Sequence, residues 1–292
     1  MGKLVRALSE DGGIVCIALD STDIVAQAER IHQTSAVVTA ALGRLLTAAS
    51  IMGSMLKSED NSITLRVAGD GPVGALIAVT DGVGNVRGYP VNPVVELPLN
   101  GYGKLDVGGA VGQGVLHVIK DLGLKDPYVG QVPLVSGEIA EDITSYYAVS
   151  EQIPTVCGLG VLVNTDLTVL SAGGYLIQLL PGVGEETITR LEANVDKLPP
   201  VSQMLHEGMT PQQIIEKALD GFSPNILDET EVSYRCDCSR ERVERALLSL
   251  GREELGKIAE EEKVTEVGCH FCSKKYRFNR QEIRQLMERA KK

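Results

Sequence analysis

The sequence contains no tryptophan and few other aromatic residues. Three Phe and eight Tyr bring the aromatic share of its 292 residues to only 4%, so the hydrophobic core must be built from Val, Leu, Ile and Ala. Hydrophobic residues nevertheless make up 43% of the chain and charged residues 23%, which indicates a globular rather than a disordered protein. A chain of this length is expected to form roughly two domains.

The chain also lacks the segments that mark secretion or membrane insertion. Its first thirteen residues carry charges and glycines where a signal peptide has an apolar stretch, so we expect no signal peptide. Residues 36–56 are the most apolar stretch, but Arg44 lies in their middle, and a charge at the centre of a bilayer is costly. We therefore expect a core helix there and a cytosolic protein, in which clustered cysteines indicate metal or redox chemistry.

No familiar catalytic motif is present. The glycine-rich residues 101–114 match neither the dinucleotide-binding nor the P-loop pattern, and turns between strands explain these glycines better. The G-x-S-x-G and H-E-x-x-H patterns are absent, and the four histidines are scattered along the chain. Glu138, Glu141 and Asp142 are explained by the acidic first turn of a helix. We therefore predict that the protein is not an enzyme.

Charge is divided unevenly along the chain. The net charge is -11, but residues 232–292 hold 15 Lys/Arg and 11 Asp/Glu, a net of +4, and residues 1–231 hold a net of -15. The large acidic part would repel phosphates, so neither nucleic acid nor an anionic membrane is expected as the main partner. The basic C-terminal part leaves a nucleic-acid-binding alternative open.

Residues 1–180 show an α+β pattern. Residues 13–18 resemble a strand, and apolar and polar residues alternate in residues 63–67, as in a half-buried strand. Glycine-rich turns separate the strands, whereas residues 34–56 and 138–151 show helical spacing. We predict that residues 1–180 form a core domain with a mostly antiparallel sheet and packed helices.

Residues 181–231 are predicted to be a helical linker. Residues 184–198 carry an apolar face, and Thr210, Pro211 and Gln213 form a helix start with a capping box. Two short amphipathic helices are not stable alone, so they must rest on another surface. The segment is also rich in acidic residues, as expected of a metastable docked linker.

Four of the six cysteines fall in residues 232–292, where two short pairs stand about thirty residues apart. Cys236 and Cys238 form one pair and Cys269 and Cys272 the other, with a predicted helical hairpin between them. Such pairs can bring four sulfurs to the corners of a tetrahedron, which predicts a closed site for one zinc ion. His270 is then an exposed neighbour, because four sulfurs complete the shell. A domain of this size has only marginal stability without a bound metal or disulfides.

The Cys-x-Cys spacing permits redox chemistry without requiring it. Two sulfurs this close can oxidise to a strained local disulfide, and zinc-held thiolates are the form that oxidants attack. If both pairs oxidise, zinc leaves, and a binding free energy on the order of 10–16 kcal/mol that supported folding is lost. Site chemistry alone still favours a structural zinc. The remaining cysteines, Cys16 and Cys157, lie in apolar stretches and are predicted to be buried, inert thiols.

Further motifs accompany the cysteine pairs. Residues 136–142 read SGEIAED and are followed by Tyr146 and by SEQ at residues 150–152; RGY occupies residues 87–89 and GGYLIQ residues 173–178. With these motifs the chain resembles, in order and over essentially its whole length, the thirty-three-kilodalton heat-shock protein family of bacteria. The cysteine pairs resemble the redox switch of that family.

The resemblance implies a redox-regulated, ATP-independent holdase that binds unfolding client proteins under oxidative stress. It implies that Cys236, Cys238, Cys269 and Cys272 bind zinc in the reduced state and form the disulfides Cys236–Cys238 and Cys269–Cys272 on oxidation. Zinc release would then unfold the linker and uncover an apolar surface. The active form would be a homodimer, and clients would pass to an ATP-driven foldase. From the residues alone, three alternatives stay open: a zinc-ribbon nucleic-acid binder, an enzyme with a structural zinc, and a thiol–disulfide oxidoreductase.

Overall fold

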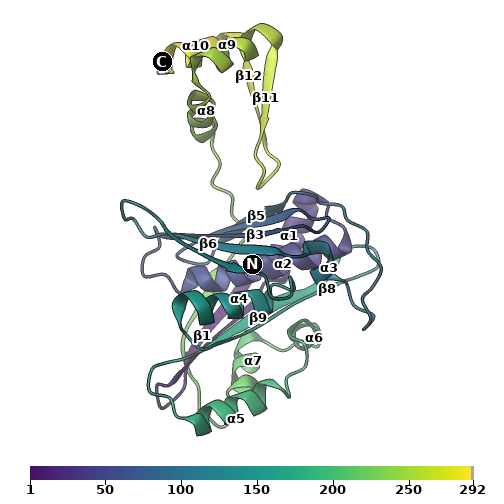
Figure 1. Cartoon of the computed structure of the whole chain (residues 1–292), viewed down its shortest axis with the longest axis vertical. Helices are drawn as coiled ribbons and strands as arrows, with labels where there is room; N and C mark the ends of the chain where they lie inside the picture. The colour runs from purple at the N-terminus through teal and green to yellow at the C-terminus, as the bar shows by residue number, and fades with distance from the viewer. Residues whose placement is uncertain (291–292) are drawn as a thin grey trace. The chain divides into compact units, whose positions relative to one another are not determined.

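The computed structural model describes residues 1–290, which form two compact units (Figure 1). The first unit is Met1–Arg235, and the second begins at Cys236. The segment predicted to be a linker belongs to the first unit. The functional division into residues 1–180, 181–231 and 232–292 stays a prediction.

The first unit contains two five-stranded sheets in which every pairing between strands is antiparallel, as predicted for an α+β fold. Sheet A has the order β10-β1-β2-β9-β8, and sheet B has the order β5-β4-β3-β6-β7. The strands of sheet A are β1 (Gly2–Leu8), β2 (Ile14–Asp20), β8 (Thr155–Val163), β9 (Val169–Leu179) and β10 (Asn225–Val232). Those of sheet B are β3 (Ser62–Gly69), β4 (Ala75–Asp81), β5 (Val86–Pro90), β6 (Gly114–Asp121) and β7 (Tyr128–Pro133).

Helices separate the two sheets and cover the far side of sheet A. The helices of this unit are α1 (Thr22–His32), α2 (Ala36–Ser54), α3 (Val107–Val111), α4 (Ala140–Tyr146), the π-helix η1 (Tyr147–Glu151), α5 (Glu185–Val195), α6 (Val201–His206) and α7 (Pro211–Ala218). Helix α2 contacts strands of both sheets and lies between them (Figure 1). Helices α6 and α7 contact sheet A on its other face, and α5 packs on α7.

Helix α2 is the central helix of the main core. It is long and apolar enough to cross a membrane by length and composition, but 89% of its most apolar window is buried inside the protein. The prediction of a core helix is therefore confirmed. Arg44 forms an ion pair with Glu138, which offsets the cost of its partial burial. Gly43 lets the helix approach closely, since a Cβ there would lie 2.7 Å from Val25 and 2.9 Å from Val161.

A second hydrophobic cluster lies between sheet A and helices α5–α7. The side chains from the sheet are Val5, Ala7, Ile14, Cys16, Ala18, Tyr175 and Ile177. The side chains from the helical segment are Leu191, Val201, Met204, Ile214, Ile215, Ala218 and Leu219. The predicted capping box of α7 is confirmed: the Thr210 hydroxyl accepts from the Gln213 backbone N–H at 3.3 Å, and the Gln213 side chain accepts from the Thr210 N–H at 2.9 Å.

The structure corrects two local predictions. Residues 225–231, expected within a helical segment, form most of β10, because the strand gains its hydrogen bonds from β1, more than two hundred residues away in the sequence. Within the predicted glycine turns of residues 101–114, Val107–Val111 form a short helix. Asp106 caps this helix by accepting from the Gly109 N–H, and Val107, Ala110 and Val111 are buried, so tertiary packing overrides the low helix propensity of glycine.

The second unit is small. It consists of α8 (Arg240–Ser249), α9 (Gly251–Glu261), the hairpin β11 (Val264–Gly268) and β12 (Lys275–Asn279), and α10 (Arg280–Arg289). Its buried side chains are Leu247, Leu255, Ala259, Tyr276, Phe278, Ile283 and Leu286. Ser239 caps α8, and Asn279 forms a capping box with Glu282 at the start of α10.

Candidate metal centre and redox site

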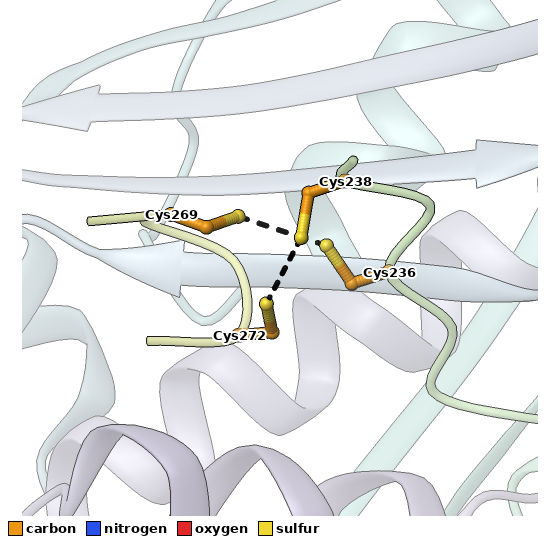
Figure 2. Close-up of side chains that lie close together, drawn as sticks. All are labelled: Cys236, Cys238, Cys269 and Cys272. Carbon is orange, nitrogen blue, oxygen red and sulfur yellow. Dashed lines mark hydrogen bonds between the residues drawn. The ribbon is translucent and has the colours of Figure 1, made fainter. Parts of the chain in front are cut away.

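The four C-terminal cysteines meet in one cluster. Cys236 and Cys238 precede α8, whereas Cys269 and Cys272 lie in the turn that joins β11 to β12, and the four sulfurs point toward one another (Figure 2). The Sγ atoms of Cys236 and Cys269 are 3.7 Å apart, those of Cys238 and Cys272 are 3.4 Å apart, and all four lie within 4.8 Å of one another. These distances are too long for disulfides, so the cysteines are free thiols in contact.

The cluster has the dimensions of a tetrahedral metal site. With zinc–sulfur bonds of about 2.3 Å, the sulfurs at the corners of a tetrahedron would be about 3.8 Å apart. Four soft sulfur ligands favour zinc, copper(I) or an iron–sulfur centre over hard cations. Among the described residues, no histidine or carboxylate joins the cluster, and His270 is exposed beside it, as predicted.

A tight turn positions Cys269 and Cys272. The Cys269 N–H donates to the Lys274 carbonyl at 2.9 Å, and the Ser273 N–H donates to the Cys269 carbonyl at 2.8 Å. Ser273 has a φ of 59°, which reverses the chain between the second cysteine and β12. Both sulfurs are therefore fixed at the end of a hairpin whose register pairs Gly268 with Lys275.

Side-chain contacts join the Cys236–Cys238 segment to α8 and join the start of α8 to β12 and α10. Asp237, between the two cysteines, pairs with Arg242 in the first turn of α8 at 2.5 Å. The Arg240 guanidinium lies 4.2 Å from the ring centroid of Phe278 and donates to Glu282 at 2.7 Å. The segment is therefore tied to β12 and α10 through side chains that flank the cysteines.

Most of the basic residues close in sequence to the four cysteines are paired with carboxylates. Besides Arg240 and Arg242, Lys275 and Arg277 both pair with Glu266, at 2.6 Å and 3.1 Å. Their charge is largely neutralised locally and is not concentrated on the cluster. This pairing also weakens the case for a basic surface that would bind nucleic acid.

Tyr276 is a part of the site that sequence reasoning missed. Its hydroxyl donates to the Cys238 sulfur at 3.1 Å, and its ring belongs to the core of the second unit. Partial desolvation raises the pKa of Cys238, but the hydrogen bond from Tyr276 and the neighbouring thiols outweigh it and lower the pKa. Alternation in residues 275–278, with Tyr276 and Phe278 buried, was the available signal for this strand.

The thiols of the cluster differ in their ease of ionisation when no metal is bound. Desolvation is the largest influence on Cys236 and Cys272 and raises the pKa of both thiols. Hydrogen bonds from backbone N–H groups partly offset this effect: that of Cys238 lowers the pKa of Cys236, and that of Lys274 lowers the pKa of Cys272. Cys238 is thus the thiol whose environment favours the thiolate, which is the form that binds metals and reacts with oxidants.

The other two cysteines belong to the first unit and are not members of the cluster. Cys16 is fully buried in β2, and Cys157 in β8 is half-buried and packs against the main core. Burial raises the pKa of both thiols, that of Cys157 to about 12. They are therefore protonated and unreactive in the folded protein.

The acidic residues near the start of α4 have structural roles. Asp142 is buried, and its carboxylate accepts from the backbone N–H groups of Val135 at 2.7 Å and Ile139 at 2.9 Å. Glu138 pairs with Arg44 and accepts from the Gly108 N–H at 2.9 Å. These contacts go beyond the predicted acidic first turn, since they join three separate segments of the core.

Comparisons with known proteins place these features in a family context. The family model described as "Hsp33 protein" matches residues 2–279. The 33 kDa chaperonin of Clostridioides difficile is 49% identical over 286 residues, with 98% of each chain covered. That of Acetivibrio thermocellus is 48% identical over 285 residues, covering 98% of this chain and 96% of the relative. The crystal structure of the 33 kDa chaperonin from Thermotoga maritima superposes with a TM-score of 0.91 at 38% identity, covering 98% of this chain and 97% of that one.

Proposed function

The chain belongs to the Hsp33 family of chaperones, and we propose that it is a redox-regulated, ATP-independent holdase that binds unfolding proteins under oxidative stress. The observation that carries the proposal is the four-thiol cluster. Its ligands come from two segments about thirty residues apart that meet only when the second unit is folded. Metal binding and folding of this unit are therefore coupled.

Zinc bound by Cys236, Cys238, Cys269 and Cys272 would hold the second unit folded in the reduced protein. Among the described residues of this unit, seven apolar side chains are buried in its core, which is too few for a stable domain without an added cross-link or metal. Structural zinc supplies on the order of 10–16 kcal/mol in small zinc domains, so its loss would unfold the unit.

Oxidation would remove the ligands from the metal. We infer that the disulfides join near neighbours in the sequence, Cys236 with Cys238 and Cys269 with Cys272. Each disulfide forms by loss of two electrons from two thiolates, so two equivalents of peroxide convert all four ligands and are themselves reduced to water. A disulfide sulfur is a poor zinc ligand, because the metal needs the thiolate. Zinc therefore leaves, and the second unit loses its staple.

Helices α5–α7 cover the surface that would bind clients. They contain 11, 6 and 8 residues, and helices shorter than roughly 12–15 residues are marginal in water unless they pack on something. Their removal would expose the apolar face of sheet A around Ile14, Cys16 and Ile177. An apolar face of this kind binds unfolded segments without sequence specificity.

The partners follow from this mechanism. Clients are unfolding proteins held without ATP and passed to an ATP-driven foldase after reduction. The active form is a homodimer, and the protein acts in the cytosol. No catalytic activity is proposed, and nucleic acid is not proposed as a partner, because the basic residues beside the cluster are paired with carboxylates.

Light scattering from a thermally unfolding client, without ATP, tests the proposal. The protein is added either reduced with zinc or after peroxide treatment at elevated temperature, and a chromogenic chelator follows zinc release. Only the oxidised form should suppress aggregation, and zinc should appear in solution as activity develops. Equal suppression by both forms, or by neither, would show that the metal is only structural.

A further inference from the structure

Strand β10 is packed against the rest of the first unit far less extensively than β1, the strand with which it pairs. In β1, Leu4 belongs to the main core, and Val5 and Ala7 belong to the cluster beneath α5–α7, so β1 is buried on both faces. In β10, only Val232 is buried, whereas Ile226 and Leu227 are 39% and 54% exposed. Apolar burial therefore fixes β1 in the fold and contributes little to residues 225–231.

The contacts that hold β10 are polar and partly open to solvent. Besides the backbone ladder, Lys3 pairs with Glu229 at 2.6 Å and Arg6 with Asp228 at 2.8 Å, all with side chains 36–48% exposed. Exposed ion pairs add little stability because water and salt screen them. The ladder is also interrupted at Arg6, where the register skips Leu227. The strand is thus a weakly attached edge.

The chain is anchored where β10 ends. Val232 and Tyr234 are buried in the main core. The Val86 N–H donates to the Ser233 carbonyl at 3.0 Å, and the Arg235 N–H donates to the Val86 carbonyl at 2.9 Å. The Tyr234 hydroxyl also donates to a β5 carbonyl, that of Gly88, at 2.8 Å. Residues 232–235, which are the last residue of β10 and the three residues after it, therefore form an anchor on β5.

From these contacts we propose that β10 is a detachable strand whose place on β1 is taken by an extended segment of an unfolding client. On activation, residues 225–231 separate from β1 together with the released helices α5–α7, while the anchor of residues 232–235 stays in place. The inference rests on the proposed function and specifies how the activated protein binds its clients.

An uncovered β1 has the features of a strand-addition site. Its pairing with β2 and the burial of Leu4 in the main core keep β1 extended after α5–α7 leave. Its outer edge then offers unpaired backbone N–H and C=O groups that an extended peptide can satisfy. Backbone pairing is indifferent to sequence, as a holdase requires. Lys3 and Arg6 favour segments that place carboxylates opposite them, as Glu229 and Asp228 do in β10.

A disulfide staple between β1 and β10 tests this binding mode. Lys3 and Glu231 are directly opposite and both exposed, so Lys3→Cys combined with Glu231→Cys can be cross-linked by the activating oxidant. The matched control is Lys3→Ser combined with Glu231→Ser, which removes the same charges without a cross-link. Mass spectrometry after activation verifies the staple, and zinc release is measured for both proteins.

The stapled protein should release zinc like the control but should need several-fold more protein to suppress aggregation of the same client. Equal suppression by the stapled protein and an active control would overturn the inference. If the control releases zinc yet does not suppress aggregation, the proposed function fails as well, so the two failures are distinguishable.

Hydrogen exchange gives a readout that does not need the staple. Amides of β1 should exchange faster in the activated protein than in the zinc-bound protein and should slow again when a client is bound. Amides of β2, which stay paired on both sides, serve as the internal control. Unchanged protection of β1 after activation would contradict the detachment of β10.

Discussion

The hydroxyl group of Tyr276 lies 3.1 Å from the sulfur of Cys238 and donates a hydrogen bond to it. The same side chain is only 6% exposed and belongs to the core of the second unit. One residue therefore connects the ionisation state of a candidate metal ligand to the packing of the second unit. Partners of this kind stabilise the ligand in its thiolate form and fix its orientation.

Replacing Tyr276 with Phe should weaken the metal site while preserving the core. The hydrogen bond that lowers the pKa of Cys238 is lost, so the thiolate is less favoured and zinc affinity should fall by roughly tenfold. Competition with a chromogenic zinc chelator measures the change. Tyr102→Phe is the matched control, since Tyr102 is 89% exposed and distant in sequence from the ligands. The same affinity for both variants would contradict a role for Tyr276 in the site.

Replacing Cys269 with Ser should loosen the linker without any oxidant. The variant keeps three thiol ligands, so zinc binding weakens, and the folding free energy that depends on it falls. Limited proteolysis of the reduced protein should then show faster cleavage within residues 181–231. Cys157→Ala, which lies outside the cluster, should retain one zinc per chain and the original cleavage rate. If Cys269→Ser is cleaved no faster than the natural chain within residues 181–231, zinc binding does not stabilise the linker.

Cys16 can report whether helices α5–α7 leave sheet A. It is fully buried beneath them, and burial raises its thiol pKa, so it should resist alkylation in the zinc-bound protein. Removing zinc with a chelator under reducing conditions should increase the alkylation rate of Cys16 by at least tenfold. The reason is that local opening of α5–α7 would expose its thiol to the reagent. Peptide mass spectrometry identifies the site, and Cys157, which packs in the main core, is the internal reference. A protected Cys16 after zinc loss would mean that the helices stay docked.

The first unit should lose stability in mild acid partly through His32. Burial lowers the pKa of this imidazole below its ordinary value of about 6.5, against the opposing effect of the hydrogen bond with the Gly88 carbonyl. Because the folded-state pKa is depressed, the stabilising contribution is present above about pH 6.5 and is lost as the pH falls through the folded-state value.

Thermal melts of the natural chain and of His32→Gln across this pH range measure the effect. The natural chain should be the more stable one at neutral pH, and the difference in melting temperature should narrow as the pH falls below 6.5. Effects of zinc loss in acid are common to both proteins and cancel in the difference. If the difference in melting temperature between the two proteins does not change with pH, titration of His32 does not cause the loss of stability in acid.

The sequence predicts those structural elements that depend on residues close together in the chain. Thr210 caps α7 as predicted from the sequence, because a cap forms with backbone groups only two or three residues away. Ser239 and Asn279 are caps of the same local kind. Strand β10 was missed for the opposite reason. Its residues carry little apolar alternation, and what makes them a strand is a ladder with β1 at the other end of the chain.

The sequence by itself predicted which four cysteines form the candidate metal centre, because two cysteine pairs in a small basic segment are typical of a metal site. It also determined the α+β class and the family. Only the tertiary structure decided which apolar face α5–α7 cover, that Tyr276 donates a hydrogen bond to Cys238, and that β10 is an exposed edge strand on β1. Cysteine spacing is a property of the chain, whereas coverage of a sheet depends on contacts between residues that the sequence places far apart.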